Sequence, residues 1–219
     1  MGVRTIPAMI ARLRRDIRGV SAIEFALIAP ILILIYCGMA ELSSGLTAAR
    51  KASHAASAVG DLVSQQSSVS LSTMANFFLG GDDVMQPFPT SATSGSTTTL
   101  LLQQRITSAV LQSDLKTVLV SWSCTPTGQS VLTPLAVNAT LVASSGTASS
   151  SNYTSLSSLL VNAGDSVIIT EGRYTFSSPV NYMLPQSLVF TNTYFLKPRR
   201  GASVATPGTG TSGGTQCNG

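Results

Sequence analysis

Histidine is nearly absent from this 219-residue chain, and the residue clusters on which most enzyme chemistry depends are missing. The one histidine, His54, lies close to Arg50 and Lys51 in a segment with helical periodicity, where a solvated or packing role is the simpler interpretation. No second histidine, CxxC pair or carboxylate cluster offers a metal site. No phosphate-binding glycine loop is present either, so we expect neither a cofactor nor enzymatic activity.

Charge is also scarce, since Asp, Glu, Lys and Arg make up only 10% of the residues and the formal net charge is +4. The surplus lies entirely in residues 1–18, which hold five arginines and one aspartate. Basic and acidic residues balance from residue 19 onward, so a nucleic-acid partner is not expected. By the positive-inside rule, this basic leader predicts a cytoplasmic amino terminus and export of the residues from 42 onward.

A membrane-length apolar run follows the leader at residues 20–40 and reads VSAIEFALIAPILILIYCGMA. As an α-helix it spans about 30 Å, the thickness of a bilayer's hydrocarbon core. Glu24 is its only charged residue, and a carboxylate near the bilayer centre costs about 2.5–3.5 kcal/mol unless a partner compensates it. Pro30 removes one backbone hydrogen bond, so we expect a helix kink there.

Removal of this run as a secretory signal peptide is an alternative, because Gly38 and Ala40 form a small-x-small site. Glu24 and the length of the run argue against it. Helical periodicity instead continues past the run and predicts one long helix from about residue 15 to about residue 66. Its second half carries a narrow stripe of small residues, which suits close packing.

The remaining exported residues, 67–200, predict one α+β domain in which short strands form an antiparallel sheet. Alternating or β-branched patterns predict strands at residues 117–124, 135–142, 166–176 and 188–196. Helical patterns predict an amphipathic helix at residues 100–116 and a shorter one at 153–162. Composition predicts a turn at residues 80–83, Ser/Thr-rich loops at 90–99 and 144–151, and a disordered tail at 201–219.

Two of the three cysteines, Cys124 and Cys217, fall in the exported part, where an oxidising compartment permits a disulfide between them. Because Cys217 belongs to the expected flexible tail, an intermolecular bond stays open. The third, Cys37, lies in the apolar run and is interpreted as a packing or lipid-facing residue.

The segment RGVSAIEF at residues 18–25 resembles the TadE/TadG-like family of pilus assembly proteins, the minor pilins or pseudopilins of the tight-adherence (Flp-type) system. A basic leader, Gly19, Glu24 five residues later and the aromatic Phe25 carry the resemblance, and Glu41 also fits. It covers about residues 12–45, with weaker similarity at EGRYTFSSP and LKPRR near the other end. The resemblance implies a pilin-like fold and cleavage by a prepilin peptidase between Gly19 and Val20.

The same resemblance implies how the chain would act. After cleavage Val20 carries a free ammonium group, and Glu24 of one subunit can pair with this amine of a neighbour inside the membrane or filament. The implied partners are membrane lipid, prepilin peptidase, other pilin-like subunits and the tight-adherence assembly platform. The implied location is the bacterial inner membrane, as a single-pass protein that can also enter the pilus. The alternative is an uncleaved, membrane-anchored extracytoplasmic binding module.

Overall fold

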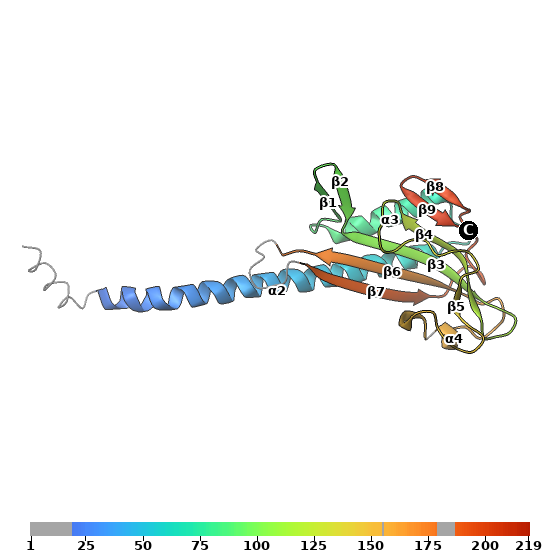
Figure 1. The fold of residues 1–219 in the computed structure, drawn as a ribbon, viewed down its shortest axis with the longest axis horizontal. Coiled ribbons are helices and arrows are strands. Elements are labelled where there is room, and N and C mark those ends of the chain that lie inside the picture. Colours follow the sequence, from blue (N-terminus) through green and yellow to red (C-terminus); the bar gives the residue numbers. More distant parts are fainter. Residues whose placement is uncertain (1–18, 155, 179–186) are drawn as a thin grey trace, which may run out of the picture.

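One long helix dominates the computed structural model, which describes residues 19–154, 156–178 and 187–219 (Figure 1). This helix, α2, spans Val20–Ser64, and the part of the predicted helix at residues 15–18 lies outside the described residues. Its first half projects away from the rest of the chain, whereas its second half lies along a β-sheet. Pro30 lies inside α2, and the kink expected there stays a prediction.

The sheet has seven strands, in the order β7-β6-β3-β4-β9-β8, with β5 paired to β4 beside this path. Every described pair is antiparallel, so the predicted α+β class with an antiparallel sheet behind a long helix is confirmed. The strands span Leu102–Leu111 (β3), Val118–Pro126 (β4), Thr140–Val142 (β5), Ser166–Phe176 (β6), Leu188–Leu196 (β7), Gly210–Ser212 (β8) and Thr215–Asn218 (β9).

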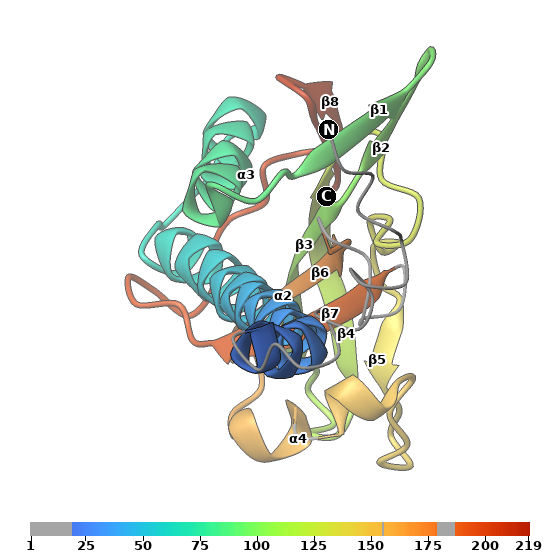
Figure 2. The ribbon, with the colours of Figure 1, turned by 90° about the vertical axis from the view of Figure 1, so that its left-hand side faces the viewer.

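Helices α2 and α3 (Leu71–Met85) cover one face of the sheet (Figure 2). The approach of α2 is so close that glycines are required at two contacts. A Cβ on Gly172 of β6 would lie 2.9 Å from the Cβ of Ala56, and one on Gly60 would lie 2.3 Å from Oγ1 of Thr170. The later part of the predicted stripe is buried here, at Ala52, Ala56, Val59 and Val63, whereas its first members, Leu42 and Leu46, are exposed. Ala48, which the prediction did not include, is also buried.

Buried apolar side chains fill both sides of the sheet. On the helix side, Trp122 and Ile106 of the sheet pack with Val59 of α2 and Phe78 of α3. On the other side, the sheet packs against residues of the segment between β4 and β6, which holds the 3-10 helix η2 (Ser151–Tyr153) and the short helix α4 (Leu156–Leu159). Both sheet faces are therefore occupied.

The amphipathic helix predicted at residues 100–116 is wrong, because these residues form the central strand β3. Strand β3 lies between β4 and β6, and nearly all of its residues are buried on both faces. Such a strand shows no simple alternation, so its apolar residues can mimic a helical stripe. The predicted strand at 135–142 shortens to β5, and the predicted helix at 153–162 divides into η2 and α4.

Three segments predicted to be irregular are ordered. The turn expected at residues 80–83 is helical, because α3 continues through Gly80 and Gly81. The Ser/Thr-rich residues 90–99 form an exposed hairpin, β1 (Ser91–Ser94) and β2 (Thr97–Leu100), whose turn includes Gly95 at φ +61°. The tail expected to be disordered holds β8 and β9 and places Val204 in the core, because β9 pairs with β4.

Candidate functional site: the exposed half of helix α2

The exposed half of α2, residues 20–40, holds most of the exposed large apolar side chains of the described residues. Its most apolar 18-residue stretch has a mean hydropathy of 2.2 and no buried residue. Large side chains such as Phe25, Leu27 and Ile31 are 61–70% exposed. An uninterrupted apolar surface of this size is not stable in water, and by length and composition it fits a single-pass membrane anchor.

Glu24 and Phe25 are neighbours on the exposed half of α2, one turn after its first residue. Both side chains are exposed, and Phe25 is 68% accessible. Glu24 stands four residues after Val20, so the start of the helix and the carboxylate share one helix face. No ion pair of Glu24 is found within residues 19–154, 156–178 and 187–219.

Gly19 is the N-cap residue of α2, and the fold does not explain why it is glycine. Its backbone has φ −98° and ψ −2°, a conformation open to any residue. A Cβ built on Gly19 would meet nothing within 4 Å among the described residues. The described residues therefore give no packing reason for a glycine at this position.

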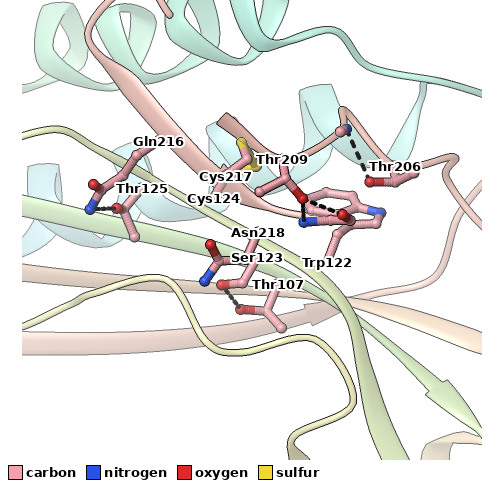
Figure 3. The surroundings of a disulfide bond; sticks show 12 residues. Thr107, Trp122, Ser123, Cys124, Thr125, Thr206, Thr209, Gln216, Cys217 and Asn218 are labelled. Atoms are coloured by element: carbon pink, nitrogen blue, oxygen red, sulfur yellow. Dashed lines mark hydrogen bonds between the residues drawn. A yellow bond between two sulfur atoms is a disulfide. The ribbon is translucent and has the colours of Figure 1, made fainter. Parts of the chain in front are cut away.

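Cys124 and Cys217 form a disulfide within this chain, between β4 and β9 (Figure 3). The two residues are direct cross-strand partners, and both are buried. Nearby, the indole Nε1 of Trp122 donates a hydrogen bond to the backbone oxygen of Val204, at 3.0 Å. The disulfide thus links β9, near the carboxyl terminus, to β4 of the sheet. Cys37 is free and half-buried.

A buried polar network on the sheet face opposite α2 was not predicted from the sequence. Arg105 Nε of β3 donates to Glu171 Oε2 of β6 at 2.6 Å, and the hydroxyl of Tyr153 donates to Glu171 Oε1 at 3.1 Å. Burial, together with the charge of Glu171, raises the pKa of Tyr153 to about 12. The available signal was a charged residue within each segment, Arg105 at residues 102–111 and Glu171 at residues 166–176. The network joins β3, β6 and η2, which indicates a structural role.

Residues 19–61 match the model of a family described as TadE-like protein. The amino-terminal segment of this chain is TadE-like. The match confirms the resemblance found at residues 18–25, and it spans the exposed half of α2 and most of the half that packs on the sheet. It implies involvement in tight-adherence pilus assembly. No curated protein and no solved structure shows significant similarity to the chain.

Proposed function

We propose that this chain is a pilin-like subunit, a minor pilin or pseudopilin, of a tight-adherence pilus or a related secretion apparatus. The observation that carries the proposal is the exposed half of α2, a TadE-like apolar helix with one carboxylate, projecting from a folded α+β domain. The role is one of assembly and not of catalysis. The size of the exported domain favours a minor, priming or tip-associated subunit over a major pilin.

The proposed location is the bacterial inner membrane, with residues 20–40 as the span. The arginines of the leader keep the amino terminus in the cytoplasm, and the domain that follows α2 is exported. The disulfide between Cys124 and Cys217 supports this orientation, because such bonds persist in oxidising compartments and are rare in the cytosol.

Processing by a prepilin peptidase between Gly19 and Val20 is the first element of the proposed mechanism. One observation supports it: a Cβ on Gly19 would meet nothing within 4 Å among the described residues. A protease with a narrow site at the cut would account for the glycine. Cleavage would make Val20 both the terminal amine and the first residue of α2.

Pairing between Glu24 and a neighbour's amine is the second element. The amino-terminal end of a helix carries unpaired N–H groups and a partial positive charge, to which cleavage adds an ammonium group. A neighbouring Glu24 can accept from these donors, which neutralises both groups in a medium where either alone is costly. The carboxylate that penalises an isolated anchor thereby favours a staggered arrangement of subunits.

Gly19→Ala tests the processing step. With a prepilin peptidase co-expressed, we expect wild type to lose its leader and Gly19→Ala to retain it, as measured by the mass of the amino terminus. Gly80→Ala is the matched control, since a Cβ on Gly80 also meets nothing within 4 Å and the residue lies far from the cut. A wild-type chain that still carries its leader would remove the cleavage claim and favour the uncleaved binding module. Loss of the leader from both chains would remove only the requirement for glycine at residue 19.

Glu24→Gln tests the pairing step, because it removes the charge and keeps the shape. We expect normal membrane insertion and leader removal but loss of assembly, scored by piliation and by cross-linking between subunits. Glu24→Asp keeps the charge on a shorter side chain and should retain partial assembly. Unchanged piliation in Glu24→Gln would contradict the pairing role while leaving the anchor and the cleavage site unaffected.

A further inference from the structure

An apolar pocket opens at the end of the domain nearest the exposed half of α2. Its volume is about 280 Å³, and it is lined by Ser44 of α2, Tyr174 and Phe176 of β6, Ser177, and residues 87–89, which follow α3. In Figure 1, the carboxyl-terminal end of β6 and the amino-terminal end of β7 are the ends that lie closest to the projecting half of α2. No charged side chain is among the lining residues.

The position of Ser44 on α2 gives the depth of this pocket relative to the apolar run. Ser44 is four residues beyond Ala40, the last residue of the apolar run, which corresponds to about 6 Å along an α-helix. The headgroup region on each side of a bilayer is about 5–7 Å thick. Leu42 and Leu46, at 55% and 53% exposure, extend the apolar surface of α2 past this level. With residues 20–40 in the hydrocarbon core of a membrane, Ser44 places this wall of the pocket in the headgroup region of the exported side.

The pocket is held in shape by contacts on all its walls. Lys51 Nζ of α2 donates to the backbone oxygen of Val84 at 3.2 Å, which ties the end of α3 to α2. The hydroxyl of Tyr174 donates to the backbone oxygen of Pro89 at 3.0 Å. The rings of Phe88 and Phe176 meet edge to face with centroids 6.1 Å apart. These contacts place aromatic rings around a preformed space at the depth where aromatic residues favour a bilayer.

We propose that this pocket binds the glycerol-proximal part of a phospholipid acyl chain from the leaflet on the exported side. Proline and aromatic rings form most of the lining, which holds no charged side chain and therefore fits a hydrocarbon chain better than a charged headgroup. Binding there would fix the rotation of the domain relative to the membrane before any assembly step. The proposal rests on membrane insertion of α2 but not on cleavage at Gly19 or on pairing through Glu24.

Tryptophan fluorescence of the full-length chain in phosphatidylcholine vesicles tests the site. The chain has one tryptophan, Trp122, which is fully buried, so wild type supplies the background. Three variants add a reporter: Phe88→Trp in the pocket, Ile28→Trp on the exposed half of α2, and Val161→Trp as a control. Val161 is 68% exposed, and its N–H donates to Asp165, at the opposite end of β6 from Phe176.

Brominated acyl chains quench a nearby indole, and the bromine position reports depth. We expect Phe88→Trp to be quenched most by bromines near the glycerol end and Ile28→Trp most by bromines near the bilayer centre. Val161→Trp and wild type should show no loss with either lipid. Equal quenching of Phe88→Trp after addition of phosphatidylglycerol would support recognition of the acyl chain and not of headgroup charge.

The other outcomes overturn distinct parts of the argument. Quenching of Ile28→Trp without quenching of Phe88→Trp would overturn the lipid site and leave the anchor intact. A Phe88→Trp emission that shifts with protein density and not with bromine would assign the pocket to a second copy of the chain. Quenching only in anionic vesicles would overturn the acyl-chain assignment. An unquenched Ile28→Trp would overturn membrane insertion itself. The Cys124–Cys217 bond, scored on a non-reducing gel, verifies that each variant is folded.

Discussion

The two halves of α2 belong to one continuous helix but answer to different surroundings. The exposed half carries large aliphatic side chains, and its most apolar stretch has no buried residue. The packed half, residues 41–64, replaces them with alanine, glycine and valine, and Ala48, Ala55 and Val63 are completely buried. Large apolar residues therefore mark the half that fits a membrane anchor, and small ones mark the half that packs on the sheet.

This difference teaches that hydrophobicity alone does not locate the core of this chain. The most apolar segment contributes nothing to the folded domain, and the helix–sheet contact is made by residues of modest hydrophobicity whose value is their small size. Close approach increases dispersion contacts between backbones, and it leaves no room for a larger side chain. Substitutions in the packed half should therefore lower the stability of the domain without affecting membrane anchoring, and substitutions in the exposed half should leave the domain's stability unchanged.

Loss of the disulfide is expected to have the largest effect on the packed half. Cys124 and Cys217 are separated by 93 residues in the sequence, and closing a loop of that length stabilises a fold by about 4–5 kcal/mol in the chain-entropy model. Cys124→Ala/Cys217→Ala should lower the free energy of unfolding of the domain by this amount, measured by denaturant titration in detergent.

The exposed half should not respond to the same change. Alkaline extraction of membranes should leave the double variant in the pellet as it leaves wild type, because the anchor makes no contact with the sheet. Cys37→Ala is the control for cysteine removal and should alter neither property. Release of the double variant from the membrane would show that anchoring depends on the disulfide-bonded domain and that the two halves are coupled.

Enlarging one small residue in each half of α2 compares them directly. In Gly60→Leu the new side chain meets Thr170 Oγ1 and Leu196 Cδ1, at 2.3 and 2.8 Å from its Cβ, so we expect a loss of about 3 kcal/mol or more. Ala26→Leu adds the same side chain where the surface is exposed, and the domain's stability should change by less than about 0.5 kcal/mol. Helix propensity does not oppose either change. If Gly60→Leu and Ala26→Leu lowered the domain's stability equally, as measured by thermal or denaturant unfolding, the proposed difference between the two halves of α2 would be refuted.

The smallest expected effect is a pH dependence that belongs to the domain alone. Burial, reinforced by repulsion from Asp83, raises the pKa of Asp82 in α3 from 3.8 to about 6. The folded state then binds a proton more tightly than the unfolded state, so this group's stabilising contribution is complete below about pH 4 and is lost as pH rises through about 6. Because Asp82 is partly exposed, we expect about 1 kcal/mol or less.

Asp82→Asn should remove this dependence and raise stability at neutral pH. Unfolding midpoints between pH 4 and pH 7 measure the difference from wild type, and Asp83→Asn, on the more exposed neighbour, is the control. A wild-type midpoint that rises with pH over this range, with the rise lost in Asp82→Asn, would show that the carboxylate is stabilised in its charged form instead.

Local patterns predicted the elements whose formation depends on their own residues. The strands predicted at residues 166–176 and 188–196 coincide with β6 and β7, and the strand predicted at 117–124 overlaps β4. Each is rich in β-branched and aromatic residues, which favour extended backbone in most contexts. The exposed half of α2 was also predicted from the sequence, because its length, its hydropathy and its single carboxylate are properties of one segment.

Two of the errors share one physical cause, which is that partners distant in the sequence decided the structure. Strand β3 is a strand because β4 and β6 bond to both of its edges, and its apolar residues have no period that distinguishes it from a helix. The carboxyl-terminal tail is polar and glycine-rich, and it is ordered because Cys217 pairs with Cys124 on β4. Neither partner can be identified from the segment itself.

The sequence by itself determined a basic leader, a membrane-length helix carrying Glu24 and an α+β domain behind it, because charge, hydropathy and residue shape are local quantities. Only the tertiary structure decided the strand order, the burial of Arg105 against Glu171, the close approach of Gly60 to β6 and the pocket beside Ser44. Each of those features forms only when several segments pack together. The interaction free energy depends on all of these segments and cannot be inferred from any single one.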